Sequence, residues 1–184
     1  MSKIKILALF GESSSGKDTI LNQIVSVCDV NKIISCTTRP KRDYEREGID
    51  YYYLGNDEFG EEVINGNMLE ATEFNGWFYG TRLSELKEDK VNIGVFNIAG
   101  VECLLEDSRL EVLPVYIMAY DKTRLLRALT REKKPNCHEI CRRFLADEKD
   151  FYDIDFEYQC YINEDFNDNE IFDNSVISDF LNFH

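Results

Sequence analysis

The feature that most constrains this sequence is a loop bounded by two glycines near its start. Gly11 and Gly16 enclose four residues, and Lys17 follows the second glycine directly. Before the loop, residues 4–10 form a nearly continuous apolar run, which is typical of a central parallel strand buried on both faces. After the loop, residues 18–27 carry apolar side chains at helical spacing. The order of strand, glycine loop and helix predicts a phosphate-binding loop.

The loop matches the glycine, four residues, glycine and lysine of the Walker A pattern, and phosphate chemistry explains these residue types. Glycines let backbone N–H groups curl around phosphate oxygens, and the lysine reaches the outer phosphates. The alternative is an ordinary glycine turn. Asp18 stands where Ser or Thr usually holds Mg²⁺, so we assign the magnesium-side hydroxyl to Thr19 and leave Asp18 as a water-mediated metal ligand or a helix cap. The residues expected to bind ATP are Gly11, Ser13, Ser14, Ser15, Gly16, Lys17, Asp18 and Thr19.

Composition limits the class of protein. A chain of 184 residues with 43% hydrophobic residues is long enough for one buried core. Its net charge of −14 disfavours binding to nucleic-acid backbones. No apolar stretch is long enough to span a membrane and the start lacks a signal-peptide layout, so we expect a cytoplasmic protein, monomeric or homodimeric, with reduced cysteines and no membrane partner. Cys137, His138 and Cys141 lack the second ligand pair of a closed zinc site.

Strand and helix patterns alternate along the chain, and most of them are separated by polar breaks. Such alternation predicts a three-layer α/β domain with a mainly parallel sheet. Residues 37–82 differ, because they are rich in Tyr, Gly and acidic side chains in short alternating runs, and they predict a small β-rich flap inserted into the sheet domain. The expected strands are 4–10, 92–98, 110–118 and 159–162, and the expected helices are 18–27, one capped by Asp121 with Leu125, Leu126 and Leu129 on its apolar face, 137–152 and 169–183.

One segment of the flap resembles a known family. Residues 35–42 read Ser-Cys-Thr-Thr-Arg-Pro-Lys-Arg, and Glu45 and the run 48–51, Gly-Ile-Asp-Tyr, follow them. This is similar to the guanylate kinase segment that binds the phosphate of GMP, and the likeness continues through Phe59, Glu70, Gly76 and residues 79–81. The resemblance implies a P-loop NTPase fold over a single domain, 1–184, with a core of 1–36 and 83–184, a nucleoside-monophosphate-binding insertion at 37–82 and a helical lid at about 127–143.

The resemblance also assigns an acceptor site for GMP. Paired arginines present forked donors to a dianionic phosphate, and tyrosine hydroxyls add neutral donors. Glu70 accepts from N1–H and the exocyclic amine of guanine, a pair of donors that adenine does not offer, while Thr81 serves O6. Taken singly, these residues are ordinary surface arginines, core tyrosines and a solvated carboxylate, and only their joint spacing favours a site. The residues expected to bind GMP are Ser35, Arg39, Arg42, Glu45, Tyr51, Glu70, Tyr79 and Thr81.

The basic segment 122–143 supplies candidates for neutralising the transferred phosphoryl group. Arg127 and Arg131 lie one helical turn apart, and Arg143 follows beyond the break at 133–136. These arginines resemble the family's lid arginines, and the alternative is a solvated basic helix. Together with Lys17 and Arg39 they form the expected catalytic cations. Asn163, after the last strand, resembles the family residue near adenine.

The sequence departs from the family pattern in one place. Asn97 and Ala99 stand where the family usually has Asp-x-Asp, and Glu102 is a candidate substitute that acts through water. The resemblance therefore implies phosphorylation of GMP or dGMP by ATP and Mg²⁺, but two alternatives stay open. One is a kinase for another (deoxy)nucleoside monophosphate. The other is an inactive module that binds phosphorylated proteins through Arg39, Arg42 and Tyr51.

Overall fold

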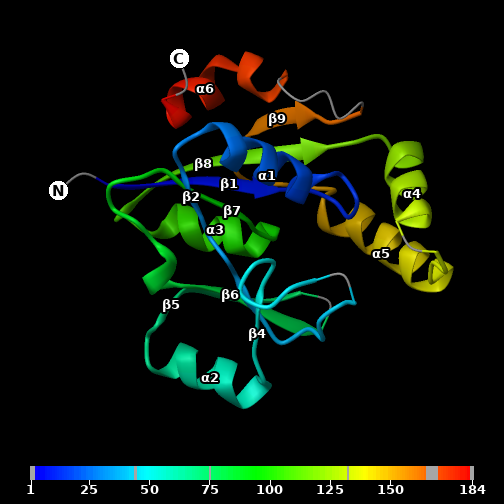
Figure 1. Cartoon of the computed structure of the whole chain (residues 1–184), viewed down its shortest axis with the longest axis horizontal. Helices are drawn as coiled ribbons and strands as arrows, with labels where there is room; N and C mark the ends of the chain where they lie inside the picture. Colours follow the sequence, from blue (N-terminus) through cyan, green and yellow to red (C-terminus); the bar gives the residue numbers. More distant parts are fainter. Residues whose placement is uncertain (1–2, 44, 75, 132, 165–169, 183–184) are drawn as a thin grey trace. The chain divides into compact units, whose positions relative to one another are not determined.

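The computed structural model describes residues 3–43, 45–74, 76–131, 133–164 and 170–182, which divide into two compact units (Figure 1). The first unit comprises Met1–Ala8 and Asp29–Val112, and the second comprises Leu9–Cys28 and Leu113–His184. The chain passes from one unit to the other three times: within β1 (Ile4–Phe10), between Cys28 and Asp29, and within β8 (Leu110–Met118). Within these described ranges, no helix is long and apolar enough to cross a membrane.

The five-stranded sheet has the order β2-β7-β1-β8-β9. The edge pairs are parallel, with Asn31 opposite Asn92 and Val115 opposite Gln159. Residues 6–10 of β1 are fully buried, which explains the unbroken apolar run in a strand that occupies the middle of the sheet. The predicted α/β class with a mostly parallel sheet is confirmed. The other strands are β2 (Asn31–Lys32), β7 (Asn92–Val95) and β9 (Gln159–Ile162).

The first unit also contains a smaller sheet, which lies within the predicted flap. Its order is β4-β3-β6-β5, and β5 and β6 form an antiparallel hairpin. Figure 1 shows helix α2 beside this hairpin, and Phe59 of α2 is buried and stacks on Phe78 of β6 with ring centroids 5.7 Å apart. The elements are β3 (Cys36–Thr37), β4 (Tyr52–Tyr53), α2 (Asn56–Ile64), β5 (Met68–Phe74), β6 (Trp77–Arg82), the 3-10 helix η1 (Leu83–Glu85) and α3 (Ile98–Glu106).

In the second unit, aromatic side chains pack around the end of β1. The ring of Phe10 lies 5.4 Å from that of Tyr116, 5.7 Å from that of Tyr158 and 6.4 Å from that of Phe151. Helix α1 buries Ile20, Leu21 and Ile24 at helical spacing. The helices are α1 (Lys17–Val27), α4 (Asp121–Thr130), α5 (Cys137–Asp150), the 3-10 helix η2 (Glu170–Asp173) and α6 (Ser175–Leu181).

Several predicted boundaries were wrong because polar side chains stop or start elements locally. The strand predicted at 92–98 ends at Val95, because the Asn97 side chain accepts a hydrogen bond from the Gly100 N–H and begins α3. Asp121 is the first residue of α4 and not its cap, and Tyr120 occupies the cap position without a side-chain bond. The helix predicted at 169–183 is divided, because Asn174 caps a separate α6; residues 165–169 lie outside the described ranges.

One helix was missed, and the predicted apolar face of another is wrong. Helix α2 was not predicted within the flap. In α4 the expected apolar face is wrong, since Leu126 and Leu129 are 52% and 39% exposed whereas Arg124 is 1% exposed. An arginine, and not a leucine, is therefore the fully buried side chain of this helix.

Substitution by alanine should have opposite effects on stability at Gly80 in strand β6 and at Gly60 in helix α2. A Cβ added at Gly80 would lie 2.8 Å from the backbone oxygen of Glu70, so Gly80→Ala should lower the free energy of unfolding by about 1–3 kcal/mol. A Cβ at Gly60 meets nothing within 4 Å, so Gly60→Ala should raise it by about 0.5–1 kcal/mol. Urea titration of both variants checks this, and similar effects at the two sites would contradict it.

Candidate functional site

The glycine loop is shaped by three residues with positive φ. Gly11 has φ 148°, Ser14 has φ 62° and Gly16 has φ 98°. A Cβ at Gly11 would lie 2.3 Å from the carbonyl oxygen of Ile117, so only glycine fits there. Ser14 adopts the left-handed conformation although it carries a side chain, a conformation that is uncommon outside glycine. Local sequence thus bends the loop from β1 into α1.

Lys17 is folded back onto the loop that precedes it. Its Nζ donates to the carbonyl oxygens of Gly11 and Glu12, each at 2.8 Å. Burial lowers the pKa of this lysine, and neighbouring carboxylates oppose the shift. Asp18 and Thr19, the two residues predicted near Mg²⁺, are exposed in the first turn of α1.

The predicted cations of the second unit are placed differently from one another. Arg127 donates to Ser15 O at 3.2 Å and to Asn163 O at 2.8 Å, so it lies at the loop. Arg143 pairs with Glu139 at 2.7 Å, and Arg131 is exposed directly after α4. The structure therefore brings one of these three arginines to the loop.

Asn163 also contacts the loop. It is 1% exposed, and its Nδ2 donates to Ser15 O at 2.8 Å. Its Oδ1 and the Ser15 hydroxyl are buried and have no hydrogen-bond partner among the described residues. Buried polar atoms without partners are uncommon in proteins, and they are suited to meeting a ligand or an ordered water.

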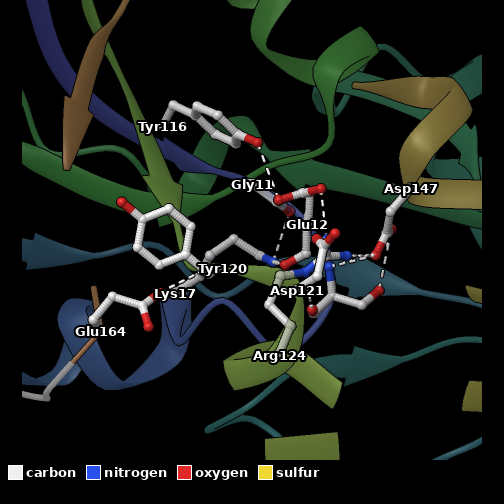
Figure 2. Close-up of polar contacts among 10 residues, drawn as sticks. Gly11, Glu12, Lys17, Tyr116, Tyr120, Asp121, Arg124, Asp147 and Glu164 are labelled. Carbon is white, nitrogen blue, oxygen red and sulfur yellow. Dashed lines mark hydrogen bonds and ion pairs between the residues drawn. The ribbon is translucent and has the colours of Figure 1, made fainter. Parts of the chain in front are cut away.

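An ion-pair network that the sequence analysis missed lies beside the loop (Figure 2). Arg124 donates from Nη1 to Glu12 at 2.7 Å and from Nη2 to Asp147 at 2.6 Å. Burial raises the pKa of the Glu12 carboxyl, while Arg124 opposes the shift. Nothing in the local sequence distinguishes Arg124 or Asp147 from the other charged residues of this segment.

In the first unit, strand pairing and strand alternation place four of the eight predicted acceptor residues, namely Tyr51, Glu70, Tyr79 and Thr81, on one face of the smaller sheet. Tyr79 pairs with Thr37 on one side and with Thr72 on the other, and Thr81 pairs with Glu70. Residues paired directly across strands share a face, as do residues two apart along a strand. Because Thr37 also pairs with Tyr53, the same face continues onto β4. The shared face therefore carries Thr37, Tyr51, Tyr53, Glu70, Thr72, Tyr79 and Thr81.

Arg39 and Arg42 are held at this sheet by Glu45. Arg39 is 9% exposed, donates from Nη2 to Glu45 at 2.7 Å and lies 5.5 Å from the ring centroid of Tyr51. Arg42 donates to the same carboxylate through its backbone N–H at 2.8 Å, and the Tyr53 hydroxyl does so at 2.8 Å. Burial opposes ionisation of Glu45, but these donors outweigh it and hold its pKa below the usual value. Tyr53 was not among the predicted residues, although the alternation of Tyr51 and Tyr53 places both on one face.

Ser35 immediately precedes β3 in this sheet. It is half-buried, and its carbonyl oxygen accepts a hydrogen bond from the N–H of Tyr52 at 2.9 Å. This bond fixes the backbone of Ser35 beside β4.

Glu70 is a buried carboxyl group on the shared face. It is 7% exposed, and burial raises its pKa to about 7, with the neighbouring Thr81 hydroxyl opposing the shift. The Thr81 hydroxyl is itself buried and makes no hydrogen bond of normal geometry within the described ranges. A carboxylate and a hydroxyl that are paired across two strands suit a ligand edge with both donors and an acceptor.

Asn97 and Gly100, at the start of helix α3, lie near Glu70 and Thr72 of β5. A Cβ added at Gly100 would lie 3.4 Å from Glu70 Oε2, so the carboxylate lies against the first turn of the helix. Asn97 accepts from the Gly100 N–H at 2.7 Å and donates from Nδ2 to Thr72 at 2.8 Å. The side chain that replaces the expected aspartate thus joins α3 to β5. Ala99 and Glu102, in the same helix, are both exposed.

Comparison with known proteins agrees with this architecture. The family model for guanylate kinase matches residues 3–174. The chain is 31% identical to the guanylate kinase of Prochlorococcus marinus over 147 residues, which cover 77% of this chain and 79% of that protein. It is 38% identical to the guanylate kinase of Malacoplasma penetrans over 86 residues, which cover 46% of this chain.

The extent of the matches varies among the relatives. The aligned segment spans 44% of the Malacoplasma penetrans protein, so the chain matches less than half of that relative. Among solved structures, the guanylate kinase from Anaplasma phagocytophilum has a TM-score of 0.69 and 25% identity, and the match covers 98% of this chain and 86% of that one. The structural match therefore extends over more of this chain than the sequence match to the Malacoplasma penetrans protein does.

The buried carboxyl of Glu70 should make stability depend on pH. Its pKa is about 7 in the folded protein against 4.5 without burial, so the folded state binds the proton more tightly and loses stability as pH rises between these values. Glu70→Gln removes this loss, and we expect the variant to be more stable by up to about 3 kcal/mol near pH 8 and unchanged near pH 4. Urea unfolding across this range measures the difference. Glu73→Gln, at an exposed position of the same strand, is the control, and a gain independent of pH would contradict the assignment.

Proposed function

Since this chain belongs to the guanylate kinase family, we propose that it transfers the terminal phosphoryl group of ATP to GMP or dGMP in the presence of Mg²⁺. The observation that carries the proposal is the shared face of the smaller sheet. On this face a buried carboxyl, Glu70, and the tyrosines next to the arginine pair Arg39 and Arg42 occur together. A guanine nucleotide has complementary groups at its two ends, a donor-rich base edge and a dianionic phosphate.

The acceptor phosphate binds to Arg39 and Arg42, with hydroxyls from Ser35, Tyr51 and Tyr79. Glu45 carries negative charge and is already bonded to both arginines, so its role is to fix their forks and not to touch the phosphate. The guanidinium of Arg39 lies 5.5 and 5.9 Å from the ring centroids of Tyr51 and Tyr53, so its orientation is restrained before a ligand binds. Such preorganisation lowers the entropic cost of binding.

The guanine edge binds to Glu70 and Thr81. The ionised carboxylate accepts from N1–H and the exocyclic amine, and the Thr81 hydroxyl, which makes no hydrogen bond of normal geometry among the described residues, donates to O6. Adenine offers no matching pair of donors, so it would leave a buried carboxylate without partners, which costs free energy. Asn97 is engaged with Gly100 and Thr72, so Glu70 is the acceptor that reads the base.

The glycine loop binds ATP through its backbone N–H groups and through Lys17, which leaves the loop carbonyls to reach the phosphates. Arg127, Arg131 and Arg143 neutralise the transferred group, and Asn163, which binds Ser15 O, is assigned to the adenine. No group of three His, Cys, Asp or Glu side chains with metal-ligand spacing occurs among the described residues. Mg²⁺ carried by ATP needs only one or two protein oxygens, and Thr19 with Asp18 fits this requirement. The ion contributes charge neutralisation at the phosphates.

In the reaction, an oxygen of the GMP phosphate forms a bond to the terminal phosphorus of ATP while the bond from that phosphorus to the ADP oxygen breaks. The charge on the transferred group requires cations and the exclusion of water, but no covalent intermediate with the protein. We assign this closure to the insertion 37–82 and the lid 127–143 of a single domain. The free cysteines are consistent with the reducing conditions of the cytoplasm.

The test is an ADP-release assay with GMP, dGMP, AMP, dTMP and dCMP as acceptors. We expect turnover with the guanine nucleotides alone. Arg42→Met should raise the KM for GMP roughly tenfold or more and leave the KM for ATP unchanged, because a forked donor to the phosphate is lost. Arg46→Met is the matched control, since Arg46 is 67% exposed and pairs only peripherally with Asp50 at 3.6 Å.

Other outcomes separate the alternatives. Turnover with a different monophosphate would favour a kinase of altered base choice, consistent with Asn97 and Ala99. No turnover with any acceptor, together with binding of phosphorylated peptides that Arg42→Met abolishes, would favour the binding module. Unchanged GMP kinetics in Arg42→Met would reject the acceptor site.

A further inference from the structure

The backbone carbonyls of the glycine loop are occupied by side chains. Lys17 binds the carbonyl oxygens of Gly11 and Glu12, each at 2.8 Å. Arg124 Nε donates to Ser13 O at 3.1 Å, and Asn163 Nδ2 donates to Ser15 O at 2.8 Å. Cationic and amide donors therefore hold the carbonyl side of the loop at four residues.

Holding a carbonyl fixes the direction of the next N–H. The described peptide bonds are trans, and in a trans peptide the C=O of one residue and the N–H of the following residue point in opposite directions. The bond from Arg124 to Ser13 O therefore turns the N–H of Ser14 to the opposite side of the loop. That side is the one a phosphate chain must occupy if it is to meet backbone donors.

Arg124 is itself fixed by a carboxylate that binds the same loop residue. Asp147 accepts from Arg124 Nη2 at 2.6 Å, from the Ser13 N–H at 2.8 Å and from the Ser13 hydroxyl at 3.2 Å. The N–H and the C=O of Ser13 are thus both bound by this pair. Arg124 also lies over the ring of Phe144, 4.6 Å from its centroid. Figure 2 shows its bond to Glu12.

Burying the charges of Arg124 and Asp147 costs free energy of desolvation, so the stability of the fold alone does not explain why the pair is present. The side chains of Arg124 and Asp147 are 1% and 3% exposed. Replacing a buried ion pair by apolar side chains is often neutral or stabilising, so ion pairing alone does not explain its presence. The residue that follows the clamped one, Ser14, has φ 62°, a conformation that disfavours side chains and needs support from its surroundings.

We propose that Arg124 and Asp147 are positioning residues that hold the Ser13–Ser14 peptide so that the Ser14 N–H faces the phosphate chain of ATP. The proposal rests on the proposed function, because it assumes that the loop binds a nucleotide. According to this proposal, Arg124 and Asp147 affect the affinity for ATP and ADP but not the affinity for the acceptor GMP.

The test compares Arg124→Lys with Arg109→Lys. Lysine keeps the charge that pairs with Asp147, but its single nitrogen cannot occupy the three separate positions from which Nε, Nη1 and Nη2 of Arg124 bind Ser13 O, Glu12 and Asp147. Arg109 is a matched control, because it makes a forked bond to Asp107 and its side chain is 65% exposed. Binding of ADP and of GMP is measured separately by calorimetry, and the KM for ATP and for GMP in the ADP-release assay.

We expect Arg124→Lys to weaken ADP binding and to raise the KM for ATP, each roughly tenfold, while GMP binding and its KM stay within about twofold. Asp147→Asn, which keeps the size of the side chain but removes its charge, should behave alike. Arg109→Lys should match the wild type in every measurement.

Three results would overturn the proposal. They are unchanged ADP affinity in both folded variants, equal losses for ADP and GMP, or failure of both variants to fold, which would make the pair a purely structural element. ADP binding does not need an acceptor, so a wild type that binds ADP but phosphorylates no monophosphate would refute the proposed function and still leave the clamp testable.

Discussion

Ion pairs between buried arginines and carboxylates hold both of the proposed nucleotide sites in place. In the first unit, Glu45 restrains Arg39, and in the second, Asp147 restrains Arg124. The two pairs work differently. Arg39 donates from Nη2 to Glu45 and from Nη1 to the carbonyl oxygen of Pro40, and its remaining N–H groups are the ones that we assign to a phosphate. Arg124 uses its donors on Glu12, Asp147 and the Ser13 carbonyl, so it acts on the backbone and not directly on a ligand.

Local patterns predicted much of the central sheet. Strand β1 and strand β8 have the predicted limits, because both are mainly apolar strands of the central sheet; Gly11 follows the first and Arg109 precedes the second. The position of the glycine loop was also predicted from the sequence, because the positive φ angles at Gly11 and Gly16 favour glycine at these two positions. The positions that failed are those where a single polar side chain decides an element, as Asn97 does for α3 and Asn174 for α6.

Tertiary contacts explain what the sequence could not reveal about the sites. The spacing of Arg39, Arg42 and Glu70 is recorded in the sequence, but the bonds that Glu45 makes with its neighbours depend on how the chain turns between β3 and β4. Arg124 lies in a helix with exposed leucines, so periodicity predicts the wrong buried face. Burial of an arginine requires partners from distant segments, here Glu12 and Asp147, and no periodic pattern encodes such a set.

An acidic protein can bind anionic nucleotides because the local field, and not the net charge, determines affinity at short range. The net charge of −14 is screened over about 8–10 Å at physiological ionic strength, whereas oriented N–H groups and fixed arginines act within contact distance. Several carboxylates nearest the proposed sites, Glu12, Glu45 and Asp147, are neutralised by arginines and so add little repulsion. Glu70 is the exception, and its burial without an arginine is what suits it to a ligand that brings hydrogen-bond donors but no positive charge. A guanine base is such a ligand, and this contrast between one uncompensated carboxyl and several compensated ones is the physical basis of the proposed specificity.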